Sequence, residues 1–215
     1  MNRTLVFERI PGLSDYRGMH ERQLALREAV ARGASPDTVL LLEHAPVITL
    51  GRRADRSHVI APTERLDELG IDTLPVDRGG DVTYHGPGQM VAYPILDLNH
   101  WKPSVGWYLR SLEQVVIDVV ADYGLVGERL EGFTGVWVGG AKVAAIGIGV
   151  HHWVTCHGLA LNVDPDMRHW ACIIPCGIAD KPVTSLAGLL GRVPGMTEVM
   201  DGFERHFRKL FGEGE

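Results

Sequence analysis

The stretch that decides the expected fold is VWVGGAKVAAIGIGVHHWVTCHGLALNV, residues 136–163. Apolar and β-branched residues dominate it, and we predict strands over 135–140, 141–150 and 151–163. The glycine pair Gly139-Gly140 predicts a hairpin turn, because glycine readily adopts the positive φ of tight turns. We therefore expect a group of strands late in the chain.

Further strands and helices are predicted outside this block. Strands are expected at 38–44, 46–51, 74–78 and 90–98, where Pro94 indicates a sheet edge or a bulge. Helices are expected at 15–32, 62–70, 104–124 and from 197 onward. Strands are grouped and helices stand apart, without regular strand–helix alternation. This pattern indicates an α+β fold in which mixed or antiparallel sheets are flanked by helices.

Composition indicates an ordinary globular protein. The 215 residues are 45% hydrophobic and 22% charged, and no linker-like stretch divides them, so we expect one domain over residues 1–215. No apolar run approaches the roughly 20 residues that span a bilayer. The first residues, MNRTLVFERIPG, lack the apolar core of a signal peptide, so we expect a cytoplasmic protein with reduced cysteines and no membrane partner.

The charge balance argues against general nucleic-acid binding. The formal net charge is −6, whereas nucleic-acid-binding surfaces are usually basic. One local basic cluster stands out, formed by Arg52, Arg53 and Arg56. It is either a binding rim or a solvated loop.

The densest chemical signal is RGGDVTYHGPGQ, residues 78–89. Its glycines leave backbone N–H groups open to an anion or a polarised oxygen, and amides near Gly79-Gly80 or around Cys176 are candidate oxyanion donors. The alternative is a tight hairpin whose glycines only supply positive φ. Neither the GxxxxGK[ST] loop nor GxGxxG before a helix is present, so nothing indicates nucleotide use.

Two neighbouring motifs place polar residues on predicted interior strands. Lys142 begins an apolar run with small residues, where its ammonium either needs a partner or reaches to water along the strand end. The small residues either leave a slot for a thin apolar chain or mark close backbone packing. His157 begins HGLALNV, 157–163, and is a candidate polar site residue, whereas His151 and His152 fit a surface turn.

The late stretch IIPCG, 173–177, holds Cys176 between Pro175 and Gly177, which can present a side chain at a defined angle. The alternative is a buried structural cysteine, and Cys156 is interpreted as such a core residue. His169, Cys172 and Cys176 share one segment, but no CxxC or HExxH pattern exists. We therefore expect neither a metal nor a cofactor.

The motifs RGGDVTYHGPGQ, GAKVAAIG, HGLALNV and IPCG, in this order and spacing, resemble the lipoyl(octanoyl) transferase family of lipoate biosynthesis. The resemblance covers nearly the whole chain and implies a fold similar to the catalytic domain of biotin and lipoate protein ligases. Those ligases carry a similar glycine-rich stretch but activate their acid with ATP. The HGPGQ sequence after Tyr84 and the late PCG cysteine favour the transferase.

The resemblance also implies roles for individual residues. Cys176 would be the acyl-accepting nucleophile, Lys142 its partner, and His157 a supporting residue. His85 would also have a supporting role, either positioning the carrier's arm or relaying a proton. One wall of the substrate site would consist of Arg78, Gly79, Gly80, Asp81, Val82, Thr83, Tyr84 and His85. Strand edges along the acyl chain would be made by Ala145, Ile146, Gly147, Gly158, Leu159 and Ala160.

The implied reaction moves an octanoyl group from octanoyl-acyl carrier protein to a lysine through an S-acyl-cysteine. The acceptors would be lipoyl domains of 2-oxoacid dehydrogenase complexes and the glycine cleavage H protein. A Lys142 ammonium would stabilise the thiolate, or a neutral Lys142 would take the thiol proton. Three rival interpretations are an ATP-dependent lipoate or octanoate ligase, a cysteine thioesterase, and a carrier-binding module without turnover.

Overall fold

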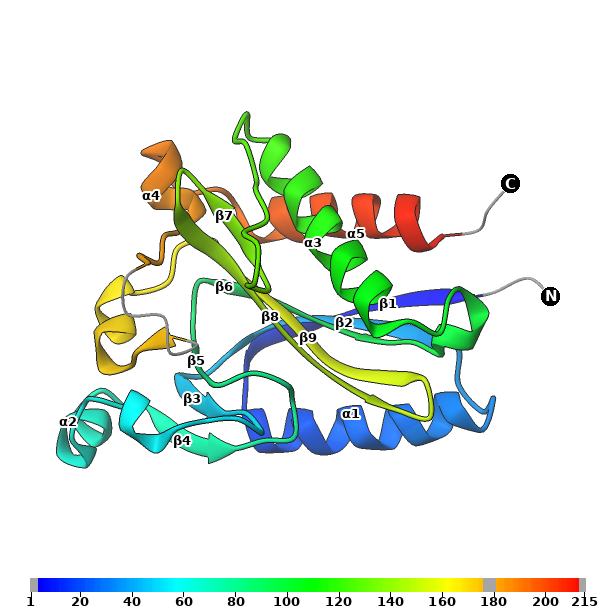
Figure 1. The fold of residues 1–215 in the computed structure, drawn as a ribbon, viewed down its shortest axis with the longest axis horizontal. Helices are drawn as coiled ribbons and strands as arrows, with labels where there is room; N and C mark the ends of the chain where they lie inside the picture. The colour runs from blue at the N-terminus through cyan, green and yellow to red at the C-terminus, as the bar shows by residue number, and fades with distance from the viewer. Residues whose placement is uncertain (1–3, 176–180, 213–215) are drawn as a thin grey trace.

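Two β-sheets organise the computed structural model, which describes residues 4–175 and 181–212 (Figure 1). The larger sheet has the strand order β1-β2-β6-β9-β8-β7. Its strands are β1 (Leu5–Ser14), β2 (Asp37–His44), β6 (Gln89–Ile95), β7 (Val136–Val138), β8 (Ala141–His151) and β9 (Val154–Asn162). Strands β1 and β2 are parallel, and the other neighbours are antiparallel.

The smaller sheet has the order β4-β3-β5. Strand β3 (Val47–Leu50) lies between β4 (Asp72–Pro75), to which it is parallel, and β5 (Val82–His85), to which it is antiparallel. Both sheets therefore mix strand directions, and helices pack around them. The expected α+β class is confirmed.

Helices cover both faces of the larger sheet. Helix α1 (Tyr16–Ala31) packs on one face, and α3 (Val105–Ala121) and α5 (Met196–Phe211) pack on the other (Figure 1). Two shorter helices are α2 (Thr63–Glu68) and α4 (Leu186–Leu190). Single 3₁₀ segments span Arg56–His58, Leu98–His100 and Met167–Cys172. Within the described residues, no helix has the length and apolar character needed to cross a membrane.

Local sequence explains where the long helices begin. The Asp15 side chain accepts a hydrogen bond from the Gly18 N–H at the start of α1, and the Ser104 hydroxyl accepts one from Trp107 N–H at the start of α3. These side chains satisfy amides that the first helical turn leaves without intrahelical partners. The predicted positions of both helices are confirmed.

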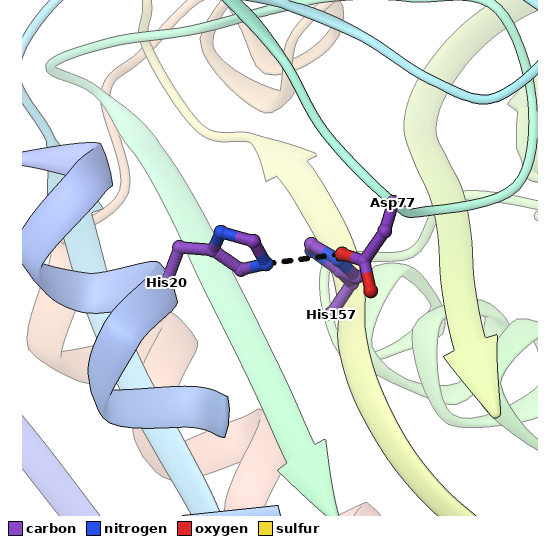
Figure 2. A group of neighbouring side chains, drawn as sticks. All are labelled: His20, Asp77 and His157. Atoms are coloured by element: carbon purple, nitrogen blue, oxygen red, sulfur yellow. Dashed lines mark hydrogen bonds and ion pairs between the residues drawn. The ribbon is translucent and has the colours of Figure 1, made fainter. Parts of the chain in front are cut away.

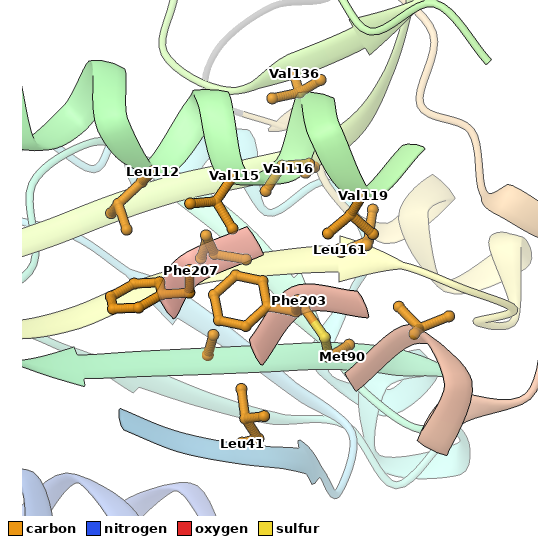
Figure 3. Packing of buried hydrophobic residues seen from close by; sticks show 14 of the residues in the cluster. Leu41, Met90, Leu112, Val115, Val116, Val119, Val136, Leu161, Phe203 and Phe207 are labelled. Atoms are coloured by element: carbon orange, nitrogen blue, oxygen red, sulfur yellow. The ribbon is translucent and has the colours of Figure 1, made fainter. Parts of the chain in front are cut away.

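The main core lies between the larger sheet and the α3–α5 pair (Figure 3). Phe203 and Phe207 of α5 are fully buried with ring centroids 5.5 Å apart, and Phe207 stacks on Phe211 at 4.3 Å. Val116 of α3 and Leu161 of β9 belong to the same cluster. Aromatic burial of this size contributes strongly to stability because large apolar areas leave water.

The two predicted turns in residues 136–163 are present. Gly139 and Gly140 connect β7 to β8 with φ of 56° and 81°. His152 and Trp153 connect β8 to β9 with φ of 48° and 64°, which is uncommon for residues other than glycine. The exposed His151 and His152 confirm the prediction of a surface turn.

The ladder between β6 and β9 ends at Ala92, so Pro94 pairs only with β2 and has an open side, as expected for an edge or a bulge. Helix α4 was not predicted, and two strands also differ from the prediction. Strand β1 was not predicted, because a register shift between Arg9 and Leu13 interrupts its alternation. Strand β5 was hidden inside the glycine-rich run, where only four residues are extended.

Candidate functional site

A pocket lies between the glycine-rich segment that begins at Arg78 and the paired strands β8 and β9. The space between its walls measures about 450 Å³, a figure that includes open solvent at its mouth. The lining residues are Tyr16, Arg78, Gly79, Gly80, Thr83, His85, Tyr93, Ala145, Ile146, Gly147, His157, Gly158, Leu159 and Ala160. Most residues expected at the substrate site therefore surround one space.

One wall of the pocket consists of small and apolar residues on two paired strands. Ala145 pairs with Ala160, Ile146 with Leu159, and Gly147 with Gly158. A Cβ on Gly158 would lie 2.1 Å from the carbonyl oxygen of Ala92 in β6, so β9 accepts only glycine there. Close backbone packing, one of the two interpretations of the small residues, thus explains Gly158.

The buried side chain of Arg78 holds the opposite wall of the pocket in place through hydrogen bonds. Its buried guanidinium donates to the carbonyl and hydroxyl of Thr49 and to the carbonyls of Gly79 and Asp81, at 2.7–3.2 Å. These bonds fasten the glycine-rich loop to β3. The Gly79 N–H donates to Ile148 O at 2.8 Å, so it is not free to serve as an oxyanion donor.

Three residues of the expected wall do not line the pocket. Asp81 accepts hydrogen bonds from His58 and from the Asp55 amide. Val82 and Tyr84 belong to the core cluster under α2, and the Tyr84 hydroxyl pairs with His169 Nδ1 at 2.7 Å. Alternation along β5 explains the division, because Thr83 and His85 face the pocket and their neighbours face away.

His157 occupies a strained position at the polar end of the pocket. Its φ is 56° in the middle of β9, and such backbone strain concentrates at functional sites. Its amide donates to Gln23 Oε1 at 2.7 Å, and its Nε2 lies 2.6 Å from Asp77 Oδ1. His20 Nε2 lies 3.0 Å from the same oxygen (Figure 2). Hydrogen bonds from both imidazoles hold the pKa of Asp77 well below its usual range.

His20, Asp77 and His157 are also of the types that ligate metals (Figure 2). Ligands of one ion at bond lengths near 2.1 Å stand more than 3 Å apart in tetrahedral geometry. Here both nitrogens approach one oxygen at 2.6 and 3.0 Å, which are hydrogen-bond distances. Arg27 Nη1 adds a positive charge 4.0 Å from the second Asp77 oxygen. The arrangement therefore fits two N–H donors on a carboxylate rather than an ion.

Two tyrosines complete the polar end. Tyr16 OH lies 3.4 Å from His157 Nδ1, and Tyr93 OH lies 2.7 Å from His44 Nε2. His44 Nδ1 lies 3.0 Å from the Ser14 carbonyl. Burial lowers the pKa of His44 to about 4 and raises that of Tyr16 to about 12, so both groups are neutral near pH 7.

A chain of side-chain amides connects the pocket to Lys142. His85 Nδ1 lies 3.2 Å from Gln89 Oε1, and Gln89 Nε2 donates to Asn162 Oδ1 at 3.0 Å. Asn162 Nδ2 donates to the Thr184 carbonyl at 2.9 Å, and Thr184 N–H donates to Lys142 O at 2.9 Å. Gln89 and Asn162 face each other in the β6–β9 ladder, which explains their contact.

Lys142 lies at the start of β8 with only 7% of its surface exposed. Its Nζ is 4.9 Å from the centroid of the Trp137 ring, a cation–π distance. Lys142 N–H donates to Pro182 O at 2.8 Å, and Lys142 bridges Val183 in parallel. Desolvation is therefore confirmed for this lysine, and the interpretation of a side chain reaching to water is wrong.

Cys176 lies outside the described residues. The chain before it is anchored where Ile173 bridges Val59, and the chain after it is anchored beside Lys142 at Val183. The other two cysteines are buried, as expected for Cys156, and burial raises the pKa of both thiols. Cys156 Sγ accepts a hydrogen bond from Arg27.

Sequence reasoning missed several residues of this site, among them Tyr16, His20, His44, Asp77 and Tyr93. Except for Asp77, they lie on α1, β2 or β6, elements that were predicted without any site residue. Asp77 had one available signal, because it directly precedes the glycine-rich motif. Nothing local marks the others, because packing of α1 against β6 and β9 brings them to the pocket.

The fold and the pocket define a catalytic domain of the lipoate ligase type. The chain belongs to the lipoyl protein ligase A/B catalytic domain family, whose model matches residues 15–208. Its relatives include proteins named Octanoyltransferase from Solibacter usitatus (49% identity, 93% of this chain, 90% of the relative) and Chloroflexus aurantiacus (53%, 89% and 86%). The family expected from the four motifs is confirmed.

Solved structures show the same fold at low sequence identity. Lipoate-protein ligase A bound with ATP superposes with a TM-score of 0.73 at 16% identity, over 98% of this chain and 86% of that chain. Biotin protein ligase from Aquifex aeolicus in complex with biotin and ATP gives 0.56 at 15%, over 97% and 69%. These likenesses confirm the expected biotin and lipoate ligase-like fold.

Proposed function

We propose that residues 1–215 act as one octanoyltransferase domain, which moves an octanoyl group from octanoyl-acyl carrier protein to the target lysine of a lipoyl domain. The observation that carries the proposal is the high identity to proteins named Octanoyltransferase over nearly the whole chain. The acceptors are lipoyl domains of 2-oxoacid dehydrogenase complexes and the glycine cleavage H protein.

The transfer proceeds in two steps. The Cys176 thiolate attacks the thioester carbonyl carbon, a new C–S bond forms, and the bond to the carrier sulfur breaks. The carrier thiolate leaves and takes up a proton. The acceptor amine then attacks the S-acyl carbon, the C–S bond to Cys176 breaks, and an amide forms as the amine gives up a proton. Because thioester aminolysis is downhill, ATP is not required.

Lys142 is the partner of Cys176 in both steps. Its burial and its backbone bonds to residues 182 and 184 hold it beside the segment that follows Cys176 in the sequence. Its ammonium stabilises the thiolate before attack and gives its proton to the leaving carrier thiolate, so that its neutral amine can accept a proton as the amide forms. A desolvated environment strengthens such charge interactions.

The acyl chain lies along the apolar wall made by residues 145–147 and 158–160. Ala145 and Ala160 contribute only methyl groups to this wall. Ile146 and Leu159 supply larger apolar contacts. Burying each methylene of the chain contributes about 0.8 kcal/mol to binding.

The donor docks on the basic cluster of Arg52, Arg53 and Arg56. All three are exposed, and none forms an ion pair with another described residue. Arg52 N–H donates to Arg78 O and Arg53 N–H to Gly80 O, so the cluster is fastened to the pocket wall. An acidic carrier protein complements this charge at the rim.

Intact-mass spectrometry tests the proposal. The protein is incubated with octanoyl-carrier, and apo lipoyl domain is then added without ATP. We expect one octanoyl adduct on Cys176 that passes to the domain. Cys172→Ala is the matched control and should retain the adduct, whereas Cys176→Ala should lose it and the transfer. Transfer by Cys176→Ala would refute the covalent intermediate, and full-rate transfer by Lys142→Ala would refute the role of Lys142.

The same assay separates the rival functions. A requirement for ATP would indicate a ligase, and free octanoate without lipoyl domain would indicate a thioesterase. Carrier binding without any adduct would indicate a binding module.

A further inference from the structure

His85 carries a polar atom for which the pocket provides no partner. Its side chain is 7% exposed and lines the pocket from β5. Nδ1 is engaged by Gln89, but Nε2 has no hydrogen-bond partner within residues 4–175 and 181–212. This nitrogen is not fully enclosed by protein atoms, so it borders the pocket and is available to a ligand bound there.

Backbone carbonyls determine which His85 nitrogen carries the proton. The Thr184 carbonyl only accepts, so the Asn162 atom facing it is the amide nitrogen. Asn162 Oδ1 therefore faces Gln89, whose nitrogen donates to it and to the Tyr84 carbonyl. Gln89 Oε1 is left to accept from His85 Nδ1–H. Neutral His85 thus presents a lone pair on Nε2.

The two neighbouring histidines are fixed by the same logic. His44 donates from Nδ1 to the Ser14 carbonyl, so its Nε2 accepts the proton of Tyr93 OH. His157 donates from Nε2 to the Asp77 carboxylate, so its Nδ1 accepts from Tyr16 OH. Both phenol protons are therefore engaged by histidines rather than offered to a ligand. The polar end offers oxygen and nitrogen lone pairs.

The histidines that line this end of the pocket are neutral, and the Asp77 carboxylate is engaged by His157 and His20. Burial lowers the pKa of His85 well below its ordinary value, and nearby His44 and Arg78 lower it further. Burial likewise lowers the pKa of His157. The Arg78 guanidinium on the adjacent wall disfavours a cationic ligand. The lone pairs of these neutral side chains, beside the Arg78 cation, therefore favour a ligand group that donates a hydrogen bond and carries no charge.

We propose that the histidine–tyrosine end of the pocket is a subsite for a neutral N–H donor, which His85 Nε2 accepts. Gln89 and Asn162 are its positioning residues. The inference rests on the proposed function, in which two such donors visit the pocket. One is the ε-amine of the acceptor lysine, and the other is an amide of the arm that carries the donor thioester.

The amide chain gives this subsite a second property. The Asn162 side chain accepts a hydrogen bond from Gln89 and donates one to the Thr184 carbonyl. The Thr184 N–H in turn donates to the Lys142 carbonyl. The acceptor nitrogen of His85 and the start of β8 at Lys142 are therefore held in one framework. Preorganisation of this kind lowers the cost of aligning reacting groups.

Nitrogen-15 NMR of labelled histidines tests the tautomer without any substrate. The His85 signals are assigned by their loss in His85→Asn. We expect Nδ1 protonated and Nε2 unprotonated at pH 7. In Gln89→Met, where the acceptor is removed, a mixture of tautomers should appear. Protonated Nε2 in the wild-type protein would overturn the proposal.

A matched pair of substitutions tests the acceptor itself. In Asn the amide nitrogen replaces Nδ1, so His85→Asn keeps the bond to Gln89 but lacks the Nε2 acceptor. His85→Gln places an amide oxygen near the Nε2 position. We expect His85→Asn to slow one half-reaction about tenfold and His85→Gln to recover much of that loss. Equal, wild-type rates in both folded variants would overturn the proposal.

The half-reaction that slows identifies the source of the N–H group. Loss only in transfer from the preformed acyl-enzyme to the lipoyl domain assigns the donor to the lysine amine. Loss only in acylation by octanoyl-pantetheine, with acylation by S-octanoyl-mercaptoethanol unchanged, assigns it to an arm amide. If the wild-type protein transfers no octanoyl group, the proposed function fails, while the NMR result still decides the tautomer.

Discussion

The two faces of the larger sheet differ in chemistry. Under α3 and α5 lies the large apolar cluster that includes Phe203 and Phe207 (Figure 3). Phe207 also stacks on Phe211 of the same helix. Under α1 the apolar cluster is small, and a network of histidines and tyrosines opens into the pocket. We infer that the face under α3 and α5 supplies most of the stability. This stability allows the face under α1 to hold desolvated polar groups and the strained residue His157. Substitutions on the two faces should therefore affect different measurements.

The largest effect is expected on the apolar face. Phe203→Ala should lower the free energy of unfolding by about 3–5 kcal/mol, because a buried ring is lost and a cavity is left. Octanoyl transfer per folded molecule should stay unchanged at low temperature. Denaturant unfolding and an activity assay corrected for the folded fraction measure both. A loss below 1 kcal/mol would break the contrast between the faces.

Acid sensitivity is expected from the polar face. The pKa of His44 is about 4 in the folded protein and near 6.5 in the unfolded chain, so the unfolded chain binds the proton first as the pH falls. The contribution of neutral His44 to the free energy of unfolding is fully present above pH 6.5. It is lost as the pH falls toward 4, and the total loss is roughly 3 kcal/mol.

His44→Gln isolates this contribution. In this variant the unfolding free energy should depend less steeply on pH between pH 6.5 and 4. The change in slope should correspond to at most one proton fewer bound on unfolding. Phe203→Ala is the control and should shift the curve without changing its slope. Identical slopes for His44→Gln and the wild-type protein would contradict the assignment.

A smaller effect is expected at Asp77. Asp77→Asn weakens the acceptor for His157 Nε2–H, so Tyr16 and the polar end lose some of their orientation. Transfer should slow about tenfold, while the unfolding free energy falls by less than about 1 kcal/mol because the carboxylate is partly exposed. The exposed Asp67→Asn on α2 serves as the control. A large loss of stability with an unchanged rate would place Asp77 in the scaffold instead.

The smallest effects are expected at the pocket rim. Arg52→Ala, Arg53→Ala and Arg56→Ala should each raise KM for the carrier donor a few-fold and weaken its salt dependence, because rim charges mainly steer association. KM for a small octanoyl thioester should not change. Arg205→Ala on α5 is the control. Equal effects with both donors would show that the cluster does not dock the carrier.

Much of the fold could be predicted because its signals are local. Capping by Asp15 and Ser104, apolar spacing along α3, and the Gly139-Gly140 turn each act over a few residues. Strand β1 could not be predicted, because a register shift between Arg9 and Leu13 interrupts its alternation of residues. Strand order was equally inaccessible, because β6 pairs with β2 and β9 across long loops.

The sequence by itself determined the elements, the motif set and the residue types available for acyl transfer, because these depend on local propensity and spacing. Only the tertiary structure decided that Tyr16, Asp77 and His157 meet at one end of a pocket, and that Gln89 and Asn162 orient His85. The physical reason is that a hydrogen bond depends on distance and direction in space. Packing of α1 and β6 against β9 sets both, for residues up to 141 positions apart.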